Sequence, residues 1–156
     1  MAKKKKDPNI VQLRRRARDK WLRMLRKPPK NIKHCRMDVL RYDGDGTFGC
    51  CGLGLFPIAL GGKPVFDERR PWSTEVYYEM PDGRQLRAST FAVEDLIREY
   101  VCGIPKADVT KRNAKRMTPR EARVEQMMSD IITLNDSQKK SLDEIADFVQ
   151  RVTRRC

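Results

Sequence analysis

The sequence has no apolar run long enough to cross a membrane. Its longest stretch without a charged side chain runs from Gly46 to Gly62, only 17 residues with several glycines and a proline. A membrane-spanning helix needs about 20 apolar residues. The N-terminus is basic and lacks the apolar segment of a signal peptide. We therefore expect no membrane partner and a cytoplasmic location.

The five cysteines form no pattern typical of a metal site or a disulfide framework. An odd number of cysteines without secretory context indicates free thiols in a reducing compartment. Zinc ligands come in chelating pairs about two to four residues apart. Here Cys50 and Cys51 are adjacent and far from the other candidates, His34 and Cys35. We expect neither a metal nor a cofactor.

Two interpretations of Cys50 and Cys51 stay open. Free cysteine is among the most buried residue types, so the pair is expected to be structural. Alternatively, a cysteine at a helix N-terminus has a lowered pKa and acts as a nucleophile, with His34 as the base because it is the single histidine. The second interpretation would make the protein a cysteine-dependent enzyme.

Acidic residues are scarce in the first quarter of the chain. Residues 1–36 contain fifteen Lys and Arg but only Asp7 and Asp19, a net charge of +13, whereas residues 37–156 contain nineteen basic and nineteen acidic residues. A segregated basic segment indicates that one part of the molecule contacts a polyanion. The candidate contacts are Lys3, Lys4, Lys5, Lys6, Arg14, Arg15, Arg16, Arg18 and Arg23, with Lys111, Arg112, Lys115 and Arg116 in a second basic segment.

The stretch from Phe48 to Phe56 is the least charged part of the chain and predicts the centre of the core. It contains Cys50, Cys51 and three glycines among aliphatic and aromatic residues. Glycine allows close approach of neighbouring backbone, and cysteine is readily buried. The remaining elements are therefore expected to pack around this stretch.

The pattern of apolar residues predicts a small, single α+β domain. Helical spacing over residues 9–26, with Trp21 on the apolar face, indicates a basic N-terminal helix that ends before Pro28. One or two β-hairpins are expected, over residues 36–50 and 75–87, and residues 63–74 resemble a loop. A helix over 91–102 and a C-terminal αα-hairpin follow, the latter with capping boxes at Thr118 and Ser141. We divide the chain into a basic arm and helix, 1–36, and a globular domain, 37–156.

Two short polar motifs have structural explanations. The segment Asp43–Thr47 contains Asp-Gly twice and predicts a hairpin turn, since the glycine and glutamate that a calcium-binding EF-hand loop requires are missing. Asn135 and Asp136 follow an apolar helical pattern, and we interpret them as the end of that helix. Together with Cys50 and Cys51, they remain candidates either for the structural core or for a functional site.

The order of several blocks resembles a family of small uncharacterised bacteriophage and prophage proteins. The blocks are Trp21–Lys27, Cys50–Leu55, Leu134–Ser137 and Ser141–Val149. The family pattern has W-x-x-A-L-R, then Y-C-C-L-G-V-L, then L-N-D, then S-F-x-E-I-A-D. This chain departs from it by the insertion of Gly52 after the two cysteines. The resemblance implies a phage setting in the cytoplasm of an infected bacterium, or in the virion, and it implies that Cys51, Asn135 and Asp136 are neighbours.

These observations favour a phage-encoded, non-enzymatic accessory protein whose basic arm binds nucleic acid or a nucleoprotein assembly. A phage inhibitor that docks on an acidic surface of a host protein is the first alternative. The cysteine-dependent enzyme is the second.

Overall fold

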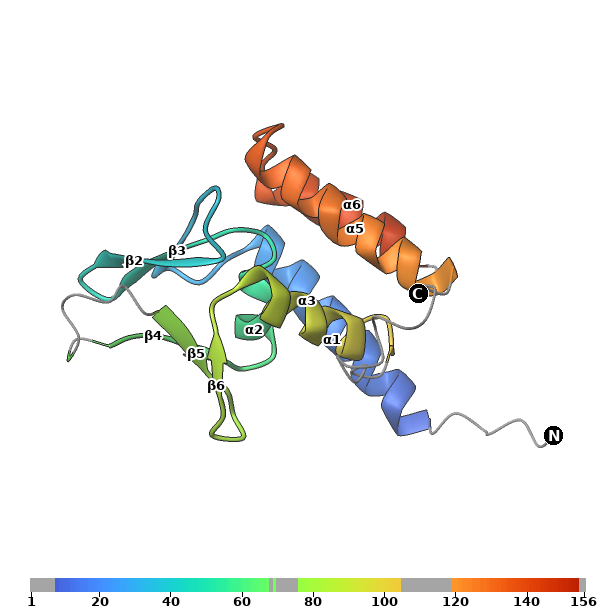
Figure 1. Cartoon of the computed structure of the whole chain (residues 1–156), viewed down its shortest axis with the longest axis horizontal. Coiled ribbons are helices and arrows are strands. Elements are labelled where there is room, and N and C mark those ends of the chain that lie inside the picture. Colours follow the sequence, from blue (N-terminus) through green and yellow to red (C-terminus); the bar gives the residue numbers. More distant parts are fainter. Residues whose placement is uncertain (1–7, 68, 70–75, 105–118, 155–156) are drawn as a thin grey trace, which may run out of the picture.

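The computed structural model describes residues 8–67, 69, 76–104 and 119–154, with the side chains of 8–15 and 120 left out. Strands gather at one end of the molecule and helices at the other, with α5 and α6 side by side (Figure 1). The elements are α1 (Pro8–Arg26), β1 (Ile32–His34), β2 (Leu40–Gly44), β3 (Thr47–Cys50), α2 (Leu55–Ala59), β4 (Lys63–Phe66), β5 (Val76–Glu79), β6 (Gln85–Arg87), α3 (Thr90–Tyr100), α5 (Pro119–Asp136) and α6 (Leu142–Thr153). The predicted α+β class is confirmed, as is the C-terminal helical hairpin.

The first sheet has the strand order β1-β3-β2. The hairpin β2–β3 turns through Gly44, Asp45 and Gly46, all with positive φ, as the two Asp-Gly pairs predict. The strand β1 was not predicted from the sequence. It pairs in parallel with β3, so that Ile32 lies opposite Phe48 and His34 opposite Cys50. Three residues are too short to show an alternating pattern, which explains why this strand went unrecognised.

The second sheet has the order β4-β5-β6. The hairpin β5–β6 is confirmed, but the expectation of a loop over residues 63–74 is wrong for β4, which pairs antiparallel with β5. Pro64 lacks a backbone N–H and is therefore unfavourable inside a sheet. It is tolerated because β4 is an edge strand, where a missing backbone N–H breaks no pairing on the open side.

The stretch Phe48–Phe56 is the buried centre of the molecule, as predicted. Leu53, Leu55 and Phe56 are at most 1% exposed. Gly54 admits no side chain, because a Cβ there would collide with the carbonyl oxygen of Val39. Two distant side chains bind the backbone of this stretch: Trp21 Nε1 donates to Gly52 O at 3.0 Å, and Tyr78 Oη donates to Gly54 O at 2.8 Å. Buried carbonyls without such donors would be costly.

Helix α1 belongs to the same core. Its Trp21 is fully buried, its ring lies 5.2 Å from that of Phe56, and Leu25 is 1% exposed. The strand β1 that follows is part of the first sheet. The division of the chain at residue 36 therefore does not separate two independently packed parts. None of the helices in the described ranges is long and apolar enough to cross a bilayer.

The helix ends follow the predicted chemistry with two differences. Ser141 and Glu144 form the expected capping box at the start of α6. The N-cap of α3 is Ser89, whose Oγ accepts from Ala92 N, so this helix begins at Thr90, one residue before the predicted start at residue 91. Asn135 does not end a helix by adopting a left-handed conformation. It lies inside the last turn of α5, which extends to Asp136.

Candidate functional site

Four basic residues form a row along the outer face of α1 and the residue that follows it. They are Arg16, Lys20, Arg23 and Lys27, spaced four, three and four positions apart, which places them above one another on one helix face. All four are exposed, and within the described part of the chain none of them forms an ion pair. We call these residues the α1 basic row.

The opposite face of α1 fixes this orientation. Ala17, Trp21 and Leu25 are buried there. Arg26 lies off the row and is neutralised by α6, where its Nη2 is 2.8 Å from Asp147 Oδ1. Because one side of the helix is in the core and another is paired with α6, the charge of the row can only face solvent.

Of the basic residues predicted to contact a polyanion, two lie in the α1 basic row, one lies beside it, and the side chains of the others are outside the described residues. Arg16 and Arg23 lie in the row, whereas Arg18 is less exposed and is 3.5 Å from Asp19. Lys20 and Lys27 complete the row, and the spacing from Arg16 could have identified them from the sequence. The side chains of Arg14 and Arg15 lie outside the described residues, as do Lys3, Lys4, Lys5, Lys6, Lys111, Arg112, Lys115 and Arg116.

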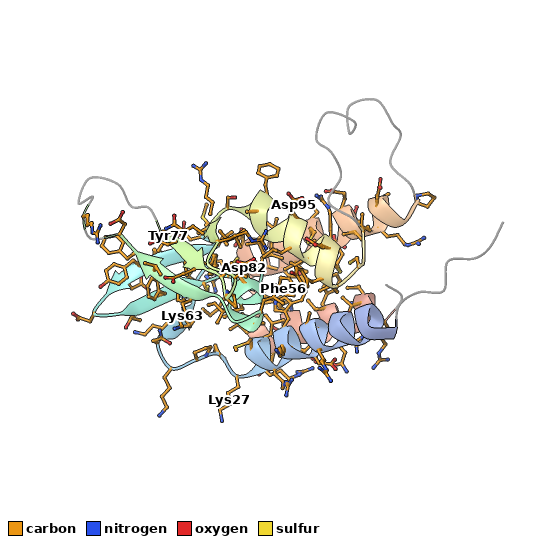
Figure 2. All side chains as sticks on the ribbon, turned by 90° about the horizontal axis from the view of Figure 1, so that it is seen from below. Lys27, Phe56, Lys63, Tyr77, Asp82 and Asp95 are labelled. Carbon is orange, nitrogen blue, oxygen red and sulfur yellow. The ribbon has the colours of Figure 1, made fainter. Side chains whose placement is uncertain are left out.

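The basic character continues beyond the helix. Lys30, Lys33 and Arg36 are exposed, and no acidic group in the described ranges pairs with them. In Figure 2 Lys27 projects from the edge of the molecule formed by α1, whereas Asp95 lies on α3 at the opposite edge. Seven exposed basic residues without a described ion pair therefore follow one another along α1 and the chain that leads through β1, although others, such as Lys63, Arg87 and Arg123, lie elsewhere.

The structure brings Asn135 and Asp136 together with the region of the two cysteines. Asn135 is 1% exposed and uses its whole side chain. Its Oδ1 accepts from Gly52 N at 3.3 Å and lies 2.8 Å from His34 Nε2, while its Nδ2 donates to Cys35 O and to Asp136 Oδ1. We call this arrangement the Asn135 cluster. It joins the end of α5 to β1 and to the backbone that follows Cys51.

The hydrogen bond to Asn135 indicates a structural role for His34. Because Asn135 Oδ1 is an acceptor, His34 Nε2 carries a hydrogen and donates it. That nitrogen cannot at the same time take a proton from a thiol. His34 thus acts here as a structural donor between β1 and α5.

The pKa values of the buried thiols are raised, whereas an activated cysteine has a lowered pKa. Burial raises the pKa of Cys51 to about 11 and raises the pKa of Cys50 further. The pKa of Cys35 is also raised, mainly by burial. A nucleophilic cysteine needs a lowered pKa, since the thiolate is the reactive form. The expectation of a lowered pKa, on which the enzyme alternative rested, is therefore wrong for Cys50 and Cys51.

A pocket of about 510 Å³ lies between α3 and the hairpin β5–β6. It is lined by apolar side chains such as Leu86 and Leu96 and by the acidic residues Asp82, Asp95 and Glu99. The described thiols and His34 do not line it. Nor do the described residues contain a group of three or more side chains that could hold a metal ion.

Comparisons with known proteins add no assignment: no family model matches the chain, and no curated protein or solved structure is significantly similar to it.

Proposed function

We propose that this protein is a non-enzymatic nucleic-acid-binding protein that holds phosphates with the α1 basic row. The supporting observation is the lack of ion-pair partners for Arg16, Lys20 and Arg23, although Arg26 on the same helix is paired twice. Basic side chains that face solvent without internal partners are available to neutralise an external polyanion.

The length of the row suits a nucleic-acid backbone. Lys27 lies eleven positions after Arg16, which corresponds to about 16 Å along a helix at about 1.5 Å per residue. One DNA strand carries a phosphate about every 3.4 Å of helix axis. The row is therefore long enough to contact several phosphates of one strand.

The phage setting is also a proposal, and it rests on the resemblance of the Cys50–Leu55 and Leu134–Ser137 blocks to bacteriophage proteins. In that setting the protein would act in an infected bacterium on DNA, RNA or a nucleoprotein assembly. A row of cations would also suit an acidic surface of a host protein. The experiment below separates these two partners.

The test compares two triple variants of the full chain. The first is Arg16→Gln, Lys20→Gln, Arg23→Gln. The matched control is Lys63→Gln, Arg87→Gln, Arg123→Gln, which removes one Lys and two Arg that are exposed and unpaired elsewhere in the described structure. Both variants reduce the formal net charge from +13 to +10, by subtraction of three. Gln also preserves helix propensity, so α1 should remain folded.

Binding to duplex DNA, single-stranded DNA and structured RNA is measured across a salt series. Loss of three phosphate contacts should reduce the slope of log K against log salt by about 2.7 for duplex DNA and about 2.1 for single strands, and weaken binding by about 10² to 10³ at 0.1 M salt. The control triple should change both quantities far less. Equal effects of the two triples would reject the row as the site, and binding that does not depend on salt would reject phosphate contact.

If the wild-type protein binds none of the three nucleic acids, the proposed function is wrong. A pulldown from nuclease-treated bacterial lysate then tests the host-protein alternative. A protein captured by the wild type and by the control triple, but lost with the α1 triple, would favour it. Proteins retained by both triples would show that the row is not the binding surface.

A further inference from the structure

Met37 is an outlier in both conformation and exposure. Its φ is 69°, in the left-handed region, and the residue is 85% exposed. A left-handed residue other than glycine costs roughly 1 kcal/mol, and a long apolar side chain gains nothing from facing water. Glycine or asparagine would form the same turn at lower cost. The turn alone therefore does not explain methionine here.

The backbone around Met37 is held by the Asn135 cluster. Met37 N donates to Asp136 Oδ1 at 2.8 Å, and the same oxygen accepts from Asn135 Nδ2 at 2.7 Å. Asn135 is anchored in the core through Gly52 N. The protruding methionine is thus fixed by a chain of hydrogen bonds that begins in the buried centre.

The other end of the loop is fixed as well. Cys51 N donates to Asp38 O at 3.2 Å, and Cys35 Sγ lies 3.4 Å from the same oxygen. The segment between Cys35 and Asp38 is therefore tied to the core on both sides of Arg36 and Met37. A side chain presented in this way loses little conformational freedom on binding, which is the main benefit of preorganisation.

The charges near Met37 in the chain favour an anionic partner. Lys33 and Arg36 are exposed without described ion pairs. Of the two carboxylates nearby, that of Asp38 is 3.5 Å from Arg41, whereas that of Asp136 accepts from the Met37 backbone and keeps its negative charge. An apolar side chain flanked by free cations is the combination that proteins use to enter between bases while they hold the neighbouring phosphates.

We infer that Met37 is an apolar wedge that inserts against or between bases of the bound nucleic acid, with Lys33 and Arg36 on the adjacent phosphates. This inference rests on the proposed function and adds a base contact to its phosphate contacts. Asn135 and Asp136 are positioning residues, because they hold the loop from the protein side and need not touch the nucleic acid.

The test uses Met37→Asn in the full chain. Asn tolerates the left-handed conformation, so the loop should keep its shape and the protein its stability while the apolar side chain is removed. The matched control is Phe91→Gln on α3, which removes the other large apolar side chain found exposed in the described residues, at 81%. A third variant, Arg36→Gln, removes a flanking cation.

Binding is measured with a 12-base-pair duplex and an RNA hairpin, each with 2-aminopurine at its centre, because the fluorescence of this base rises when stacking is lost. Wild-type protein and Phe91→Gln should increase the fluorescence. Met37→Asn should abolish the increase and weaken binding about fivefold to tenfold without a change in salt slope. Arg36→Gln should instead reduce the salt slope by about 0.9.

Three results would overturn the inference. One is salt-dependent wild-type binding with no rise in fluorescence. Another is the same rise with Met37→Asn as with wild type. The third is an equal loss with Phe91→Gln. Each of these results would reject the role of Met37 and leave the proposed phosphate contacts in place. Absence of wild-type binding would reject the proposed function and the role of Met37 together.

Discussion

Replacing Asn135 by alanine should be one of the most damaging single changes at a polar position of this protein. The amide pairs two main-chain groups that are distant in sequence, Gly52 N–H and the carbonyl of Cys35. Alanine pairs neither, and the position is 1% exposed, so bulk water does not reach it. The variant therefore removes the hydrogen-bonding link between α5, β1 and the centre of the core.

The expected loss follows from the two main-chain groups. A buried polar group without a partner costs about 1–3 kcal/mol, so the pair predicts a loss of about 2–6 kcal/mol in the free energy of unfolding. Asp136 and His34 are partly or largely exposed and add little, because water can replace Asn135 as their partner. Domains of this size have about 5–15 kcal/mol in total, so the loss is large.

Urea unfolding followed by circular dichroism measures this quantity. Asn31→Ala is the matched control, since Asn31 is exposed and its side chain makes no hydrogen bond within the described structure. The control should stay within about 0.5 kcal/mol of wild type. A loss below about 1 kcal/mol for Asn135→Ala, with an unchanged slope against urea, would refute the reasoning that the cluster secures the core.

Two further predictions concern the same buried centre. Tyr78→Phe removes the donor to Gly54 O and should cost about 1–3 kcal/mol in the same urea experiment; a stability equal to wild type would show that water reaches this carbonyl. Stability should also fall with alkaline pH, because the pKa of Cys51 is raised to about 11 from an unfolded value of 9.0. A group with a raised folded pKa contributes stability that is complete below pH 9 and is lost as pH rises through the folded pKa. The slope between about pH 9 and pH 11 should therefore approach 1.4 kcal/mol per pH unit for this thiol, and Cys51→Ala should reduce it; an unchanged slope in that variant would contradict the assignment to Cys51.

Elements with a strong local pattern could be predicted from the sequence. The helix around Trp21, the hairpin β5–β6 and the capping box at Ser141 each follow from residues within one element. The same holds for the turn at Gly44 and Gly46, where the required conformation selects glycine. In these cases local preference and tertiary packing favour the same structure.

The features that were missed depend on partners distant in sequence. The strand β1 exists because β3 offers a parallel edge, and β4 exists because β5 pairs with it in spite of Pro64. Asn135 does lie at the end of a helix, as interpreted, but its hydrogen-bond partners were not predicted. Its actual partners, Cys35 and Gly52, lie about 100 and 83 residues away. No local pattern contains that information, although the Leu-Asn-Asp block had marked the position.

The packing of α1 against the core determines which of its basic residues face solvent. Since Trp21 and Leu25 must be buried against the Phe48–Phe56 stretch, the rotation of the helix about its axis is fixed. Arg26 then meets the carboxylates of α6, whereas the row from Arg16 to Lys27 makes no ion pair within the described part of the chain. A helix that only needed solubility would gain from acidic residues three or four positions from its basic ones, since such pairs stabilise helices. Asp19 is the one acidic residue at such a spacing, three positions after Arg16 and four before Arg23, and its carboxylate is 3.5 Å from Arg18. The four cations of the α1 basic row therefore still repel one another, a cost that an external polyanion would relieve.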